Sequence, residues 1–330
     1  MDLDAYAAAH GAEWEKLHAA TRGRLGGAAA DELIEGYQSG ASQLSALKTT
    51  VGDSEVTDRL SLTLSRARLR FTGAPADPLR RVTVFFSLQL PAALYRIRWL
   101  TLAIAALTAL IAIVEASWLS SDPRLIAALG PHEALKKYAE QDFVSYYSNN
   151  AEAAFAGQVW TNNAWLAAQC IMFGILGLWV PVVIVSNAVG LGQSAAVMNE
   201  FGRLDHFFLY IAPHGQLELY SIFTAAAAGL LIFWSWVAPG ARTRLTALAE
   251  DGRAFFSIVI GVALSLLVSG IIEGFVTRQP WPWPVKIGIG TVALAAFLAY
   301  QWGAGGRAHR LGQTGDLDEV EAGARRIIDA

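Results

Sequence analysis

Cysteine is almost absent from this chain of 330 residues, which contains a single one, Cys170. An intrachain disulfide and a metal site built from cysteines are therefore excluded. Cys170 lies in an apolar run, where we expect a small buried hydrophobe and not a reactive thiol. Charge is also scarce, because 16% of the residues are charged, 54% are hydrophobic and the mean hydropathy is +0.37. This composition is typical of a membrane protein and not of an ordinary soluble one.

The motifs of common enzymes and of nucleic-acid-binding proteins are missing as well. The sequence has no P-loop, no Rossmann fingerprint, no Gly-x-Ser-x-Gly elbow and no His-Glu-x-x-His pair. Its formal net charge of -3 comes without a basic aromatic stripe or an RNA-binding signature. We therefore expect no enzyme, no cofactor, no metal and no nucleic-acid partner. The acidic start Met1-Asp2-Leu3-Asp4 does not resemble a cleaved signal peptide, so we expect a later membrane span to direct targeting.

The first part of the chain predicts a soluble helical domain and then a helix at the membrane surface. Residues 1–76 hold apolar side chains at helical spacing, and Asp53 is placed to cap a helix that runs to Arg70. Residues 77–95 mix basic and large apolar side chains, namely Arg80, Arg81, Val82, Phe85 and Phe86. This mixture indicates an amphipathic helix that lies on the membrane.

Residues 96–303 read as an α-helical membrane domain. Long apolar runs predict spans at about 97–119, 165–185, 217–238, 254–276 and 285–302. The stretch 186–212 is apolar at its ends but holds Asn199, Glu200, Arg203 and Asp205 at its centre, so we expect a broken helix or a re-entrant hairpin there. The sequence thus predicts an all-α polytopic protein with five to six embedded segments and a tail at 304–330.

The distribution of basic residues predicts the orientation of these segments. Arginines cluster before the first span, in the loop after Ala238 and in the tail, whereas the loop 120–163 holds more acid than base. Six segments place every arginine-rich region on the cytoplasmic side. We therefore expect a multi-pass protein of the bacterial inner membrane with both termini in the cytoplasm.

Four polar side chains at membrane depth form a candidate cluster: Asn187, His214, Glu218 and Glu273. His214 and Glu218 are four residues apart and share a helix face, and Glu273 ends a stripe of small residues spaced by four. Ionisable groups at this depth are costly and often functional. Proton relay, ion coordination and headgroup binding remain open for the cluster, as does a purely structural role in hydrogen bonding between helices.

Small residues accompany these side chains and predict close packing between helices. The expected packing positions are Gly174, Gly177, Gly190, Gly192, Ala225, Gly229, Gly261, Ser265 and Ser269. Such stripes serve contacts within one chain as readily as contacts between chains, so a homo-oligomer stays open. Membrane lipid is the other expected partner.

The polar positions resemble those of the stage II sporulation protein M family over about Gln141 to Val276. The resemblance is carried by Asn162-Asn163, Asn187, Pro213-His214-Gly215 with Glu218, and Glu273 in Ile271-Ile272-Glu273-Gly274-Phe275. Ala188 stands where glycine is expected and Tyr220 where proline is expected. The long N-terminal helical domain looks like the form found in bacteria that do not sporulate.

In endospore formers, the family's name member assists the remodelling of septal peptidoglycan by assembling with cell-wall hydrolases. The resemblance implies an inner-membrane protein that organises partners in an envelope complex, without implying sporulation. The rival hypothesis is a transporter or carrier that uses the polar cluster for a proton, a cation or a lipid-linked substrate. An intramembrane hydrolase with His214 and Glu218 as base and acid is a third and weaker hypothesis.

Overall fold

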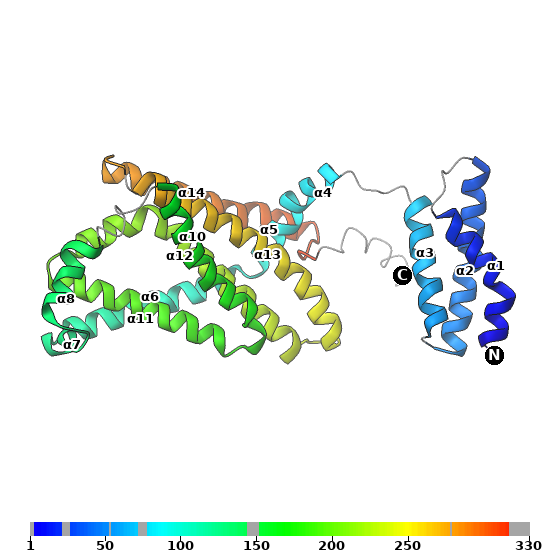
Figure 1. Ribbon diagram of the computed structural model, residues 1–330, viewed down its shortest axis with the longest axis horizontal. Helices are drawn as coiled ribbons and strands as arrows, with labels where there is room; N and C mark the ends of the chain where they lie inside the picture. The colour runs from blue at the N-terminus through cyan, green and yellow to red at the C-terminus, as the bar shows by residue number, and fades with distance from the viewer. Residues whose placement is uncertain are drawn as a thin grey trace. The chain divides into compact units, whose positions relative to one another are not determined.

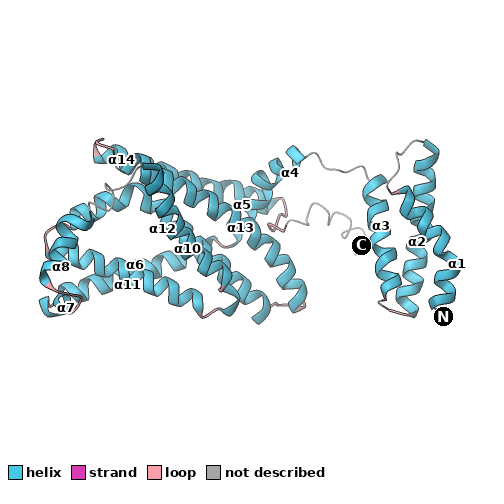
Figure 2. Cartoon of the chain, in the orientation of Figure 1, coloured by secondary structure: helices cyan, strands magenta, loops and turns pink. Residues whose placement is uncertain are grey.

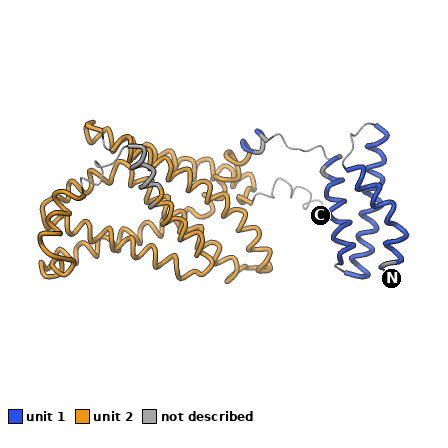
Figure 3. Tube along the Cα trace, in the orientation of Figure 1, with its two compact units in different colours: residues 1–83 blue, residues 84–330 orange. Residues whose placement is uncertain are grey.

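The protein is described by a computed structural model that covers residues 3–21, 27–52, 54–71, 78–143, 152–277 and 279–316. Every element in these ranges is helical (Figure 2), which confirms the prediction of an all-α protein. The chain divides into two compact units, residues 1–83 and residues 84–330 (Figure 3). The division falls inside helix α4 (Pro78–Val84), a few residues beyond the expected domain end at residue 76.

The N-terminal unit is a bundle of three helices with its own core. Helices α1 (Leu3–Ala20), α2 (Gly27–Thr50) and α3 (Glu55–Phe71) lie side by side in Figure 1. Leucines from all three helices fill the centre: Leu17, Leu33, Leu47, Leu60 and Leu64. Because this core is contained within the bundle, the unit has what an independently folding domain requires.

The second unit contains the apolar helices. Along the chain its elements are η1 (Phe85–Gln89), α5 (Leu90–Arg96), α6 (Arg98–Ser120), α7 (Pro123–Ala127), α8 (His132–Lys137), η2 (Tyr138–Asp142), α10 (Glu152–Met172), η3 (Gly174–Leu176), α11 (Trp179–Glu200), α12 (Leu204–Val237), α13 (Arg244–Ile272), η4 (Glu273–Thr277), α14 (Trp283–Leu298), η5 (Ala299–Ala304) and α15 (Gly305–Arg310). Within the described residues, five helical stretches are long and apolar enough to span a membrane: 98–120, 179–200, 204–237, 244–277 and 283–310. The protein is therefore a multi-pass membrane protein, and α12 packs against α6, α10, α11, α13 and α14 (Figure 1).

The second and third predicted segments are wrong in their boundaries. The predicted span 165–185 is interrupted, because α10 ends at Met172 and α11 begins at Trp179. Gly177 makes this break with a φ of 68°, a left-handed conformation that glycine adopts readily. The apolar residues on both sides of Gly177 hide the turn from a hydropathy reading.

The break expected within 186–212 is present, because α11 ends at Glu200 and α12 begins at Leu204. The polar residues at the centre of that stretch form the turn between α11 and α12, where Gly202 has a φ of 67°. Asn199, Glu200 and Asp205 are exposed at this turn. A polar helix-to-helix turn therefore makes the expected break.

Pro213 lies inside α12, so the span expected at 217–238 is the second part of a longer helix. His214 and Glu218 are consequently not in the first turn of a helix, because α12 begins ten residues before His214. The carbonyl group of Pro213 packs directly on Gly290 of α14, where any side chain would collide with it. Pro213 therefore marks a close crossing of two helices.

The loop expected at 120–163 is shorter in the structure because α10 begins at Glu152. The short elements α7, α8 and η2 occupy 123–142, and residues 144–151 lie outside the described residues. The single helix expected at 77–95 is continuous from Pro78 to Arg96 through α4, η1 and α5. Leu79, Val82 and Phe86 are exposed on its first part, whereas Leu90 and Leu94 on its second part are buried in the core of the membrane unit and not at a surface.

Helices α12 and α13 pack antiparallel in a register fixed by hydrogen bonds. Ser235 donates to Oδ2 of Asp251 at 2.7 Å, and the hydroxyl oxygens of Ser221 and Ser265 lie 2.7 Å apart. Fourteen residues separate these contacts on α12 and fourteen on α13, in opposite chain directions. The two helices therefore keep one register between the contacts.

Asp251 anchors one end of this helix pair. Its carboxylate, 2% exposed, pairs with Arg96 at 2.5 Å and with Arg242 at 3.0 Å. The hydrogen bonds of Arg242 to Asp251 and Glu250 raise the pKa of its guanidinium group, which therefore stays charged. These ion pairs connect α5, the turn between α12 and α13, and α13 itself.

A candidate polar site between α12 and η4

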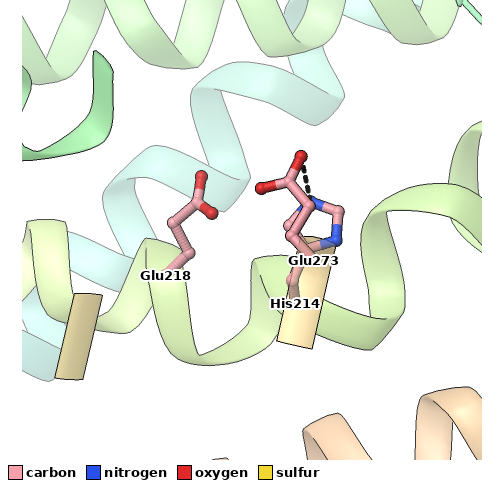
Figure 4. A group of neighbouring side chains, drawn as sticks. All are labelled: His214, Glu218 and Glu273. Atoms are coloured by element: carbon pink, nitrogen blue, oxygen red, sulfur yellow. Dashed lines mark ion pairs between the residues drawn. The ribbon is translucent and has the colours of Figure 1, made fainter. Parts of the chain in front are cut away.

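His214, Glu218 and Glu273 meet at the other end of the helix pair. One ligand atom from each side chain lies within 4.8 Å of the other two (Figure 4). His214 and Glu218 come from successive turns of α12, and Glu273 is the first residue of η4. His214 is 5% exposed, Glu273 is 2% exposed and Glu218 is half-buried. The fold thus gathers three ionisable side chains in a place that protein encloses.

His214 is held between Glu273 and Thr277. Its Nε2 atom lies 3.7 Å from Oε1 of Glu273, and its Nδ1 atom lies 3.3 Å from the hydroxyl oxygen of Thr277. The Thr277 hydroxyl also donates to the carbonyl oxygen of Ile272 at 3.4 Å. Because a hydroxyl has one proton to donate, it accepts from Nδ1 of His214, and Nε2 then carries the lone pair.

Ser269 connects the two helices within the site. Its hydroxyl is 3.0 Å from the backbone oxygen of His214 and 3.4 Å from Oε2 of Glu218. The C-terminal part of the sequence stripe on α13 and η4 therefore faces α12, through Ser265, Ser269 and Glu273. Its N-terminal part includes Gly261, which faces Leu90 of α5. Ser269 orients the carboxylate of Glu218 from the opposite helix.

Glu273 has a buried oxygen without a hydrogen-bond partner, namely Oε2. Figure 4 shows this oxygen on the side of Glu218, while the other oxygen faces His214. Among the described residues, no lysine or arginine forms an ion pair with Glu218 or Glu273. Buried acceptors of this kind are uncommon in folded proteins and call for an explanation.

Lys286 is a neighbour of the site that sequence reasoning missed. It is 4% exposed, and its amine donates to the carbonyl oxygens of Thr277 at 3.0 Å and Gln279 at 3.2 Å. The amine also lies 3.3 Å from the centre of the Trp283 ring. The sequence did hold a signal for this contact, because Lys286 is a charged residue within the predicted span 285–302. Lys286 fixes the end of η4, and its charge is directed to backbone oxygens and an aromatic ring.

Asn187 does not join the site in the way the sequence suggested. It is half-buried on α11 and, within the described structure, forms no hydrogen bond with His214, Glu218 or Glu273. Helix α11 packs mainly against α6, whereas the site lies between α12 and η4. The asparagine is therefore not one of the side chains that meet in the site. Asn163 on α10, by contrast, is buried, and the side chain of Asn162 lies outside the described residues.

Most of the predicted packing residues lie at helix contacts. A Cβ atom added to Gly174 would lie 2.5 Å from Cα of Gly229, one added to Gly192 would lie 2.7 Å from the Ala112 oxygen, and one added to Gly261 would meet Leu90. Ala225 is fully buried in α12. The remaining contacts are those of Gly177 with the Phe233 ring, Ser265 with Ser221, and Ser269 with α12.

Gly190 is the exception among these positions. It is exposed, and an added Cβ would meet no atom within 4 Å. Within the described residues, Gly190 therefore takes part in no helix contact inside the chain. Gly192, two residues further on, faces α6 instead, because residues two apart point to different sides of a helix.

Comparison with protein families follows the division into two units. The stage II sporulation protein M family matches residues 87–278, which is more than half of the chain. The chain belongs to the stage II sporulation protein M family. A domain of unknown function (DUF8413) matches residues 4–73, the part that holds α1, α2 and α3. Comparison with curated proteins and with solved structures found no match.

The stage II sporulation protein M region includes all three members of the site and ends just after Thr277. Lys286 and α14 lie beyond this region. The two matches meet near α4, close to the division between the compact units. The family membership therefore applies to the membrane unit, with the helical bundle as a separate module.

Proposed function

We propose that this protein is a non-enzymatic organiser of an envelope complex in the bacterial inner membrane. The observation that carries the proposal is the modular build: a three-helix bundle with its own core precedes a membrane unit of the stage II sporulation protein M family. The bundle is the proposed docking surface for protein partners on the cytoplasmic side. Short elements between α6 and α10 are the proposed surface on the opposite side.

The orientation rests on where the arginines meet. Arg96 and Arg242 both pair with Asp251, and Arg253 pairs with Asp316 at 2.5 and 2.7 Å. These contacts gather the start of α6, the turn between α12 and α13, and the C-terminal segment at one end of the membrane unit. Because basic residues favour the cytoplasmic side, this end faces the cytoplasm in the proposal.

The bundle offers a specific surface for docking. A pocket between α1 and α2 is lined by acidic side chains and by Trp14, whose indole donates to Gln43 at 2.6 Å. The acidic residues of its lining are Glu13, Glu32 and Glu35. A hydrogen bond from Gln43 lowers the pKa of Glu13, so the rim is anionic at neutral pH. A partner with a basic segment fits this rim.

Charge reversal tests the organiser. Full-length protein is cross-linked in membranes of its host, and partners that co-purify are identified for the wild type and for Glu32→Lys with Glu35→Lys. We expect loss of an envelope or cell-wall partner in this double variant. Glu55→Lys, an exposed glutamate on α3, is the control and should keep the partner. Unchanged capture in the double variant would refute the docking surface.

A carrier is the second candidate, and one observation favours it: the unpartnered oxygen of Glu273 in a buried cluster. Substitutions in the polar cluster distinguish the two candidates. The organiser predicts that Glu218→Gln and Glu273→Gln keep partner capture, whereas a carrier predicts loss of flux in proteoliposomes with capture unchanged. Flux that is present in wild-type protein and lost in these variants would favour the carrier.

A further inference from the structure

We propose that His214, Glu218 and Glu273 bind one divalent transition-metal ion of the series from Mn²⁺ to Zn²⁺. The inference goes beyond the organiser role and does not depend on it. It starts from the three side chains whose ligand atoms lie within 4.8 Å of one another. One imidazole nitrogen and two carboxylates form a donor set that these ions accept.

The first argument is the arrangement of acceptors. In the tautomer whose Nδ1–H donates to the Thr277 hydroxyl, the Nε2 lone pair of His214 faces Oε1 of Glu273 across 3.7 Å. No hydrogen lies between a lone pair and an ionised carboxylate. Two ligands with bonds of about 2.0 to 2.2 Å to one ion stand roughly 3.3 to 3.7 Å apart, which is the separation seen here. A cation between the two atoms turns the contact into an attraction.

The second argument is the unpartnered oxygen. Oε2 of Glu273 is buried, has no hydrogen-bond partner, and lies on the side of Glu218 in Figure 4. A buried carboxylate oxygen without a donor loses its hydration and gains nothing in return. An ion at the centre of the three side chains supplies the missing positive charge to both glutamates.

Charge balance agrees with a divalent ion. Two carboxylates and a neutral imidazole carry a net charge of minus two, which one divalent cation cancels. Among the described residues, Lys286 is a cationic side chain packed at the end of η4, and its amine is directed to the carbonyl oxygens of Thr277 and Gln279. The site therefore does not draw its compensating charge from Lys286.

The size of the site also fits. Three atoms no more than 4.8 Å apart have a common centre no more than about 2.8 Å from each, whereas bonds to Zn²⁺ measure about 2.0 to 2.2 Å. A shift of under about 1 Å in each side chain closes the difference. Glu218 is half-buried and has room to make this movement.

Outer contacts support the ligands as they do in known metal sites. The hydroxyl of Thr277 lies beside Nδ1 of His214, and the hydroxyl of Ser269, shared with the carbonyl oxygen of His214, lies 3.4 Å from Oε2 of Glu218. Contacts of this type orient ligands and strengthen binding. An ion held here links α12 to η4 at the end of the helix pair remote from Asp251.

The test uses full-length protein without a histidine tag, purified in detergent and treated with a chelator. Binding of Zn²⁺ is measured by calorimetry, with Mn²⁺, Mg²⁺ and Ca²⁺ as comparison ions. We expect one Zn²⁺ per chain, weaker Mn²⁺ binding, and at least about tenfold weaker Mg²⁺ and Ca²⁺ binding, because imidazole favours the transition metals. Glu218→Gln and Glu273→Gln should each weaken Zn²⁺ binding at least about tenfold.

The control is Glu115→Gln, because Glu115 is a half-buried carboxylate on α6 that receives a hydrogen bond from Gln193. This variant should bind Zn²⁺ like the wild type. Thr277→Val keeps all three ligands and should weaken binding about tenfold or more through the histidine tautomer. Absence of saturable Zn²⁺ binding in the wild type, or equal binding in Glu273→Gln, would overturn the proposal.

X-ray absorption on the Zn²⁺-loaded wild type keeps the proposal testable if a variant fails to fold. The expected first shell holds one imidazole nitrogen and oxygen ligands at about 2.0 to 2.2 Å. A sulfur ligand at about 2.3 Å would place the ion at Cys170 and contradict the site.

Discussion

The hydroxyl oxygens of Ser221 and Ser265 lie 2.7 Å apart, although 44 residues separate them in the chain. This contact sits between the polar site and the Asp251 ion pairs. The contact sets the register in which Ser269 meets the backbone oxygen of His214. In the same register, Glu273 meets the imidazole of His214. The geometry of the polar site depends on this alignment of α12 with α13.

Replacing Gly229 by leucine should prevent the close crossing of α12 with α10. An added side chain would collide with the carbonyl oxygen of Cys170 and approach the Cα atom of Gly174. We expect a loss of at least about 2 kcal/mol of stability, because backbone atoms cannot yield as side chains do. Thermal unfolding in detergent measures the loss.

Gly190→Leu is the matched control for that substitution. Gly190 is exposed on α11, with no atom within 4 Å of an added Cβ, so the leucine meets no obstacle. Its Tm should equal or exceed that of the wild type, since leucine is the better helix former. Equal losses in the two variants would contradict the assignment of Gly229 to a helix crossing.

Asp251→Asn should destabilise the membrane unit strongly. The substitution removes the charge that Arg96 and Arg242 share, at a side chain that is 2% exposed. Breaking a buried ion pair costs about 3 to 5 kcal/mol, because the remaining charges lose their partner. Asp205→Asn is the control, since its pair with His206 is 65% exposed at the aspartate and should change stability little. Comparable Tm losses in the two variants would argue against the buried network.

The N-terminal bundle should fold without the membrane unit. A fragment of residues 1–76 is expected to be soluble, helical and cooperative in thermal unfolding, because its leucine core lies within the bundle. Leu47→Ala should cost about 2 to 5 kcal/mol, since Leu47 is fully buried. Leu62→Ala, at a leucine that is 52% exposed, should cost far less. Circular dichroism that shows no cooperative transition in the fragment would contradict two separate units.

The sequence predicted the helical class and most of the site because both follow from local patterns. Spacing by four placed His214 with Glu218, and the part of the stripe from Ser265 to Glu273 faces α12 as expected. The break at Gly177 escaped prediction because apolar residues continue on both sides of it. The continuity of α12 through Pro213 was not predicted, because proline more often ends a helix than lies within one.

The contacts that complete the site depend on the tertiary fold and were out of reach. Thr277 and Lys286 come from η4 and α14, and nothing in their sequence spacing relates them to His214. Asn187 was placed in the cluster because its polarity at membrane depth was visible in the sequence, whereas the packing of α11 mainly against α6 was not. Sequence patterns give the face of a helix but not the neighbour that covers it.

The alignment of α12 with α13 is tested most directly by a disulfide between Ser221→Cys and Ser265→Cys. The double variant is made in a Cys170→Ala background, which removes the one native cysteine, and is oxidised in native membranes. Because the replaced hydroxyls lie 2.7 Å apart, we predict rapid and near-complete disulfide formation within each chain. Ser221→Cys with Ser257→Cys, two turns away on α13, should remain reduced. Failure of the first pair to cross-link, or equal cross-linking of the second, would contradict the register on which the site depends.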